Sequence, residues 1–293
     1  MGVERRPEGG SGADHGDSSD RGTPTDADGS SGPVGSASRV HVRRLDVVDT
    51  LRWSWEMLGD HRELVGVALA VNLLSVVAAL GITRPTPSAK PEFADWVPWL
   101  YLVQLFATLV VWGVVYLTAS AAVANRSRPL ARHLVGAFKR LPALVATAVV
   151  MGVLVGLSLL PAVGVLTMDW ANVAIGLFLT LVLALAAVYV FHRLLLAYPA
   201  CVIDRKGPVA SARASWRAAT GNVGKVFAVS AVYVVAVGVV HAIVTGASNV
   251  VSSQFDGLYD VSSALVSAAF SAVLLPVFAL AVAHLYLEGS RNQ

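Results

Sequence analysis

Six long apolar runs constrain this sequence more than any other feature. They cover approximately residues 64–82, 96–122, 143–166, 171–191, 223–247 and 261–287. A helix needs about 20 mainly apolar residues to cross the hydrocarbon core of a bilayer, and no run carries Asp, Glu, Lys or Arg well inside it. The runs also lack the alternation of barrel strands. We therefore expect an all-α membrane protein with six transmembrane helices.

Composition supports this interpretation and separates off the N-terminal segment. Charged residues make up 14% of the chain, whereas soluble domains carry about a quarter. Residues 1–38 are rich in Gly, Ser and acidic residues and contain no aromatic residue, so they cannot bury enough apolar surface to offset the entropy of ordering. We expect a disordered cytoplasmic tail at 1–38 and a six-span bundle at 39–290.

Lysine and arginine predict the orientation, because cytoplasmic loops are enriched in both. They gather before the first run and in the connections between runs two and three and between runs four and five, at Arg39, Arg43, Arg44, Arg52, Arg62, Arg126, Arg128, Arg132, Lys139, Arg140, Arg193, Arg205, Lys206, Arg213, Arg217 and Lys225. The other connections hold only Arg84 and Lys90. We expect a multi-pass plasma-membrane protein with both termini in the cytoplasm.

A repeated segment precedes the first and fifth runs. VVDTLRWSWEMLGD at 47–60 matches PVASARASWRAATG at 208–221 with a constant offset, so that Arg52, Ser54 and Trp55 correspond to Arg213, Ser215 and Trp216. Helical spacing puts apolar residues on one stripe of each segment, at Val48, Leu51, Trp55 and Leu58 and at Val209, Ala212, Trp216 and Ala219.

A weaker third copy lies at 129–142, where Leu130, Leu134, Ala137 and Leu141 form the apolar face. The sequence thus predicts three repeats, each a basic amphipathic helix followed by two spans. Such a helix is expected to lie in the plane of the inner interface, with its stripe in the acyl boundary and its arginines attracted to anionic lipid.

The run AYPACVIDRKGPVASARASWRAATGNVGKVFAV at 197–229 resembles the membrane domain named after glycerophosphoryl diester phosphodiesterases, a group that includes the YciC-like inner-membrane proteins. The residues that carry the resemblance are Pro199, Asp204, Gly207, Arg213, Ser215 and Trp216. The resemblance extends over about 45–287 in span order and implies a multi-pass membrane part. It does not imply the diesterase activity, which belongs to a separate soluble domain.

Motifs of enzyme chemistry are not found in the sequence. It contains no phosphate loop, no HExxH and no GxSxG, and its histidines show no i, i+4 pairing typical of a metal site. Cys201 is alone and is expected to be a small packing residue, with palmitoylation as an alternative. We expect no catalytic residue, cofactor or metal, and the small net charge of +3 makes nucleic acid an unexpected partner.

Two groups of residues are candidate binding sites. Arg193 directly follows the fourth run, and an apolar run at 194–203 continues beyond it. We expect Arg193 to snorkel while the remainder tilts into the interface; a helix break near Pro199 is the alternative. A lipid-headgroup site formed by Arg193, Arg213, Trp216 and Arg217 is a sharper hypothesis.

The other candidate is an intramembrane polar site at Asn72, Gln104 and His241, the kind of residues that a transport pathway would use. Gly152 and Gly156 form a GxxxG pair that favours close packing inside the bundle, with a homo-oligomer as the alternative. The favoured function is a non-enzymatic protein that organises lipids, anionic ones among them, or partner proteins through a basic cytoplasmic face. A permease component for an amphiphilic substrate is the alternative.

Overall fold

The computed structural model describes residues 45–83, 92–126, 128–166, 173–252 and 259–291. The predicted tail at 1–38, together with Arg84 and Lys90, lies outside the described residues. The described part is almost entirely helical, and its only β structure is an antiparallel pair of two-residue strands. In that pair β1 (Ile82–Thr83) runs beside β2 (Glu92–Phe93), with Ile82 opposite Phe93.

The predicted apolar runs correspond to long helices. These are α2 (Glu63–Ala79), α3 (Val97–Val123), α4 (Leu130–Leu166), α5 (Val173–Leu194), α8 (Val223–Ser252) and α9 (Tyr259–Arg291). Five described helices are long and apolar enough to cross a membrane. A sixth candidate is the pair of α1 (Val47–Asp60) and α2, which are bent by 90° at a short break. The all-α membrane fold is therefore confirmed, with five to six candidate spans.

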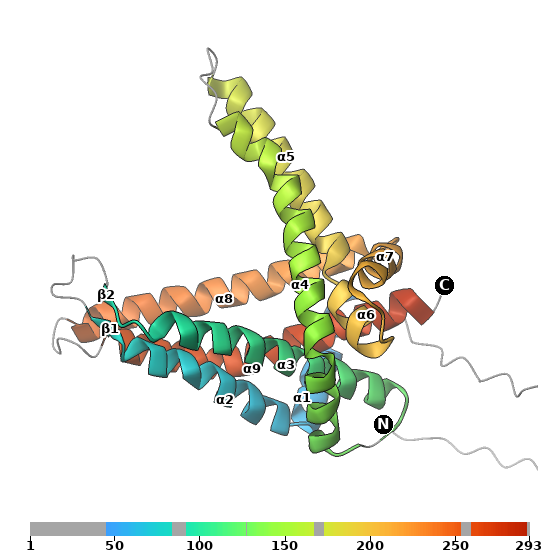
Figure 1. Cartoon of the computed structure of the whole chain (residues 1–293), viewed down its shortest axis with the longest axis horizontal. Helices are drawn as coiled ribbons and strands as arrows, with labels where there is room; N and C mark the ends of the chain where they lie inside the picture. Colours follow the sequence, from blue (N-terminus) through green and yellow to red (C-terminus); the bar gives the residue numbers. More distant parts are fainter. Residues whose placement is uncertain (1–44, 84–91, 127, 167–172, 253–258, 292–293) are drawn as a thin grey trace, which may run out of the picture. The chain divides into compact units, whose positions relative to one another are not determined.

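Helix α9 is the centre of the packing. It contacts α1, α2, α3, α7 (Pro208–Ala218) and α8, and in Figure 1 it lies among α2, α3 and α8. Its residues from Phe278 to Gly289 are buried, and they join two apolar clusters. One cluster includes Leu64, Val114 and Leu280, and the other includes Val226, Val229 and Leu285.

Helix α4 differs from the prediction of a separate third amphipathic helix at 129–142. It is continuous from Leu130 to Leu166 and contains Pro142. The predicted apolar face does pack on the first cluster, with Ala137 fully buried against Gly113 of α3. Since Leu144, just beyond Pro142, is also fully buried, packing on both sides of the proline holds one helix.

The prediction for the chain after Arg193 is wrong. Helix α5 ends at Leu194, a turn at Leu195–Leu196 follows, and α6 (Ala197–Ile203) begins before Pro199. Most of α6 is buried, including Cys201, so this run packs against other helices of the protein. The chain breaks, but at a turn four residues ahead of the proline.

The prediction that Gly152 and Gly156 allow close packing inside the chain is also wrong for the described residues. A Cβ atom added to either glycine would meet nothing within 4 Å. Helix α4 does pack along α5, and Figure 1 shows the two side by side, but these glycines do not bring it closer to another helix. The homo-oligomer alternative stays a prediction.

The repeat of 47–60 and 208–221 is visible in the burial of the two segments. Thr50 and Ser211 are fully buried, and so are Ser54 and Ser215. The burial class agrees at every position of the two segments except the pairs Leu51/Ala212 and Trp53/Ala214. Helices α1 and α7 therefore present the same face, made of small hydroxyl and apolar residues, to the rest of the protein.

The predicted lipid-facing stripe is divided between protein and surface. Val48 and Trp55 are exposed in α1, as are Val209 and Trp216 in α7. By contrast, Leu58, Ala212 and Ala219 belong to the same stripes and are buried in the protein. The two helices thus do not lie freely on an interface, because part of each stripe packs on neighbouring helices.

Candidate functional site

Contacts between distant segments gather the predicted cytoplasmic connections at one end of the bundle. Lys225 Nζ binds Leu45 O at 2.8 Å and Glu288 Oε1 at 2.7 Å, which brings the start of α1 to α8 and α9. Arg193 binds the end of α7, and a cavity joins the α3–α4 connection to α6 and Arg291. We call residues 45–62, 124–126, 128–139, 193–225 and 284–291 the basic end. Which side of a membrane this end faces stays a prediction.

A cavity of about 540 Å³ lies at the basic end, and we call it the basic cavity. Its walls come from the end of α3, the start of α4, the α6–α7 connection and the last turn of α9. Every charged side chain among the described residues that line it is a cation: Arg126, Arg128, Arg132, Lys139, Arg205 and Arg291. The cavity therefore concentrates positive charge without a lining carboxylate to balance it.

Two local backbone features position the walls of the basic cavity. Asn125 ends α3 in the left-handed conformation with φ of 50°. Arg126 N donates to Ala121 O and Asn125 N donates to Ala122 O, both at 2.9 Å, the hydrogen-bond pattern of a Schellman motif. Arg205, with φ of 56°, makes a similar reversal after α6. Both reversals place an arginine at the cavity.

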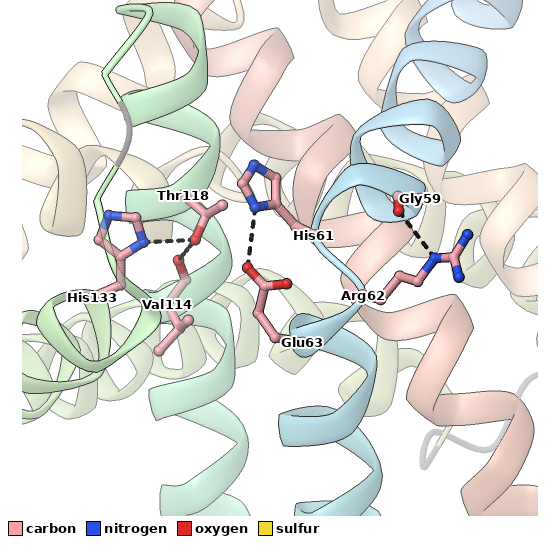
Figure 2. A network of polar contacts seen from close by, with 7 residues as sticks. All are labelled: Gly59, His61, Arg62, Glu63, Val114, Thr118 and His133. Atoms are coloured by element: carbon pink, nitrogen blue, oxygen red, sulfur yellow. Dashed lines mark hydrogen bonds and ion pairs between the residues drawn. The ribbon is translucent and has the colours of Figure 1, made fainter.

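His133 forms the inner wall of the basic cavity and is only 6% exposed. Its Nδ1 lies 2.9 Å from Thr118 Oγ1, and the Thr118 hydroxyl donates to Val114 O at 2.9 Å. Figure 2 shows this chain of contacts between α4 and α3. Within the described part of the chain, Nε2 of His133 is buried without a hydrogen-bond partner.

A second polar group occupies the α1–α2 bend beside this pair. His61 Nδ1 lies 3.1 Å from Glu63 Oε1, and Arg62 Nε donates to Gly59 O at 3.3 Å. Figure 2 shows the His61 ring pointing to Glu63 at the bend. The bend thus brings Glu63, the only acidic side chain of this network, close to the cavity wall that α3 and α4 form.

The candidate headgroup residues are brought together only in part. Arg193 donates from Nη1 to Trp216 O at 3.1 Å and to Thr220 Oγ1 at 3.0 Å, and its guanidinium lies 5.1 Å from the centre of the Trp216 ring. Ser215 Oγ in turn donates to Arg193 O at 2.6 Å. Arg193 and Trp216 therefore join α5 to the C-terminal end of α7. Arg213 and Arg217 are exposed on α7.

The candidate polar site at Asn72, Gln104 and His241 is not assembled by any hydrogen bond found among the described residues. Asn72 Nδ2 donates to Ala68 O of its own helix at 2.8 Å, and Gln104 O accepts from Thr108. His241 is exposed on α8. A polar site shared by these three residues stays a prediction.

The residues that sequence analysis missed are His133 and Thr118. The basic connection at 126–140 was interpreted as a topology signal, and its histidine received no role. A signal was present, since His133 stands on the amphipathic segment next to the predicted apolar face. Among the described residues, no three His, Cys, Asp or Glu side chains converge to hold a metal ion.

Comparison of the chain with protein family models, with curated proteins and with solved structures finds no match. The resemblance to the phosphodiesterase-associated membrane domain accordingly stays a prediction.

Proposed function

We propose that this all-α membrane protein acts without catalysis, by binding anionic phosphate-bearing groups at its basic end and so organising lipids or partner proteins there. The observation that carries the proposal is the basic cavity, whose lining cations come from separate connections of the chain. Arginine guanidinium groups bind phosphate through two parallel hydrogen bonds and remain charged at every physiological pH. A plasma-membrane location with this end in the cytoplasm would place the cavity against the anionic leaflet.

The geometry favours this function over transport. A transport pathway needs polar groups that converge near the middle of the bundle, whereas Asn72 donates within its own helix and His241 is exposed. The arginines at the α3–α4 and α6–α7 connections, by contrast, share one cavity.

The test compares two double variants that remove the same charge. Arg128→Gln with Arg132→Gln removes two of the six lining cations of the basic cavity. Arg213→Gln with Arg217→Gln removes two cations from the exposed face of α7 and tests the headgroup hypothesis made from the sequence. We expect anionic phospholipid, identified by mass spectrometry of the purified protein, to be lost from the cavity variant and kept by the α7 variant.

The wild-type protein and both variants should first be shown to unfold at the same temperature. Equal retention of anionic lipid by both variants would overturn the proposal, since the cavity would then add nothing to binding. Equal loss would overturn it too, because lipid would then respond only to total charge.

A further inference from the structure

The reversal between α6 and α7 has a strained backbone at one residue. Arg205 has a φ of 56°, and of the cations that line the basic cavity in the described part of the chain it alone has a left-handed backbone. A residue with a side chain is strained in this region, whereas glycine adopts it freely. Glycine would satisfy the reversal, so the reversal does not explain the arginine.

The two neighbours of Arg205 are fixed on one tyrosine of α9. Tyr286 is fully buried, and its hydroxyl donates to Asp204 Oδ2. Lys206 Nζ donates to Asp204 Oδ2 at 2.6 Å and to Tyr286 Oη at 3.2 Å. We call Asp204, Lys206 and Tyr286 the tyrosine clamp. Because both neighbours are held, the backbone of Arg205 is tied to the last turns of α9, which Figure 1 shows beside α6.

The guanidinium of Arg205, in contrast to its backbone, has no partner among the described residues. Arg205 is exposed and lines the basic cavity, and its side chain makes no hydrogen bond or ion pair within the described part of the chain. Arg193 and Arg52, which do not line the cavity, bind a carbonyl oxygen and a carboxylate. A held backbone with free donors favours ligand binding, because folding rather than binding then orders the residue.

We propose that Arg205 is the residue that fixes the phosphate group in the basic cavity, and that the tyrosine clamp positions it. This inference rests on the proposed function and names the residue that decides its affinity. The phosphate belongs either to a lipid headgroup or to a free phosphorylated molecule, because a guanidinium recognises the same oxygens in both. Arg205 touches the ligand, whereas Asp204, Lys206 and Tyr286 act through Arg205 as positioning residues.

The experiment measures binding to the full chain in phosphatidylcholine nanodiscs. One arm adds methyl phosphate in solution and the other adds phosphatidylglycerol to the disc, and the arm in which the wild-type protein binds identifies the source of the phosphate. Arg205→Gly should weaken that binding about tenfold, the value of one hydrogen bond to a charged group. Lys139→Gln removes the same charge from another lining residue. It should weaken binding less than about threefold, because a lysine lacks the rigid fork of an arginine.

Thermal unfolding of the same variants without added phosphate separates binding from folding. Arg205→Gly relieves the left-handed strain, so its unfolding temperature should equal or exceed that of the wild type. Arg205→Ala removes the same charge but keeps the strain, and it should unfold at a lower temperature than Arg205→Gly. Both variants should lose phosphate binding equally, which shows that the loss does not come from folding.

The tyrosine clamp is tested with Tyr286→Phe, which changes no charge. We expect it to weaken phosphate binding about threefold in the wild-type background. It should leave the residual binding of the Arg205→Gly protein unchanged, because the hydroxyl acts only through Arg205. Asp204→Asn serves the same comparison if Tyr286→Phe does not fold.

Three results would overturn this inference and leave anion binding by the wild-type protein intact. Equal loss of binding in Arg205→Gly and Lys139→Gln would mean that the cavity responds to charge alone. Additive effects of Tyr286→Phe and Arg205→Gly would mean that the clamp does not act through Arg205. Unfolding of Arg205→Gly below the wild-type temperature would mean that the arginine supports the fold. Failure of the wild-type protein to bind either phosphate probe would overturn the proposed function itself.

Discussion

The two repeated helices, α1 and α7, share their inner face and differ on their outer face. Thr50 and Ser54 of α1 correspond to Ser211 and Ser215 of α7, and all four side chains are fully buried. Both helices pack on α9. A small hydroxyl side chain lets two helices approach closely and satisfies its own proton on a backbone carbonyl, as Ser54 does on Thr50 O. Packing therefore explains what the two copies have in common.

The outer faces show where the copies diverged. On α1, Arg52 pairs with Glu56 at 2.9 Å, so this surface is close to neutral. On α7 the corresponding positions are Arg213 and Arg217, and the surface is cationic. The two copies therefore share their packing face and differ in the charged residues of their outer face.

The carboxylates that hold the starts of α1 and α7 differ in burial. The start of α1 is held through Glu288, which is 2% exposed and pairs with Lys225. The start of α7 is held through Asp204, which accepts from Tyr286 and from Lys206 Nζ at 2.6 Å, with about a third of the Asp204 and Lys206 side chains exposed. A buried pair depends far more on both partners than an exposed one does.

The largest expected effect therefore follows from Glu288→Gln. Removal of the carboxylate leaves the Lys225 ammonium without its buried partner, and we expect a loss of about 3 kcal/mol in the free energy of unfolding. Asp204→Asn at the other anchor should cost less than about 1 kcal/mol. Thermal unfolding of the purified protein in detergent measures both.

A control for this prediction removes the two charges together. Lys225→Met combined with Glu288→Met should recover most of the lost stability, because no unpaired charge then remains. Equal destabilisation by Glu288→Gln and Asp204→Asn would contradict the distinction between the two anchors.

The contact of α7 with α9 predicts an intermediate effect. A Cβ atom on Gly289 would stand 2.2 Å from Ala218 O, so Gly289→Ala must move the end of α7 away from α9. We expect a loss of about 1–3 kcal/mol in stability and faster tryptic cleavage at Arg213 and Arg217. Gly66→Ala in α2 is the matched control, since its added methyl group meets nothing within 4 Å. If trypsin cleaves α7 at the same rate in both variants, the close contact of Gly289 with Ala218 does not hold the helix.

Sequence patterns predicted the long helices well because the length and apolarity of a span are local properties. Helix α8 begins at Val223, where the sequence placed it, and the repeat was visible as a constant offset of matching residues. Patterns were less informative where distant packing decides the structure. The sequence separated the amphipathic segment at 129–142 from the span at 143–166, yet buried Ala137 and Leu144 on the two sides of Pro142 keep α4 continuous.

The candidate site was predictable in its charge but not in its geometry. The arginines of 126–132 were visible as a topology signal, but their meeting with Arg205 and Arg291 depends on how α6 and α9 pack. The same holds for Arg193, which was interpreted as a lipid contact and in the structure binds the end of α7. No local pattern shows that a carbonyl 23 residues away will be its partner.

The smallest expected effect separates the equivalent hydroxyl groups of the two copies. Ser215 Oγ donates to Arg193 O of another helix, whereas Ser54 Oγ donates to Thr50 O of its own helix. Ser215→Ala leaves the carbonyl of Arg193, at the end of α5, without this donor and should cost about 1 kcal/mol. Ser54→Ala should change stability by less than about 0.5 kcal/mol, because Thr50 O still lies within a helix and alanine favours that helix. Chemical denaturation of both variants in the same detergent tests the difference. A larger loss of stability for Ser54→Ala would contradict it, because the hydroxyl of α1, rather than that of α7, would then link two segments of the fold.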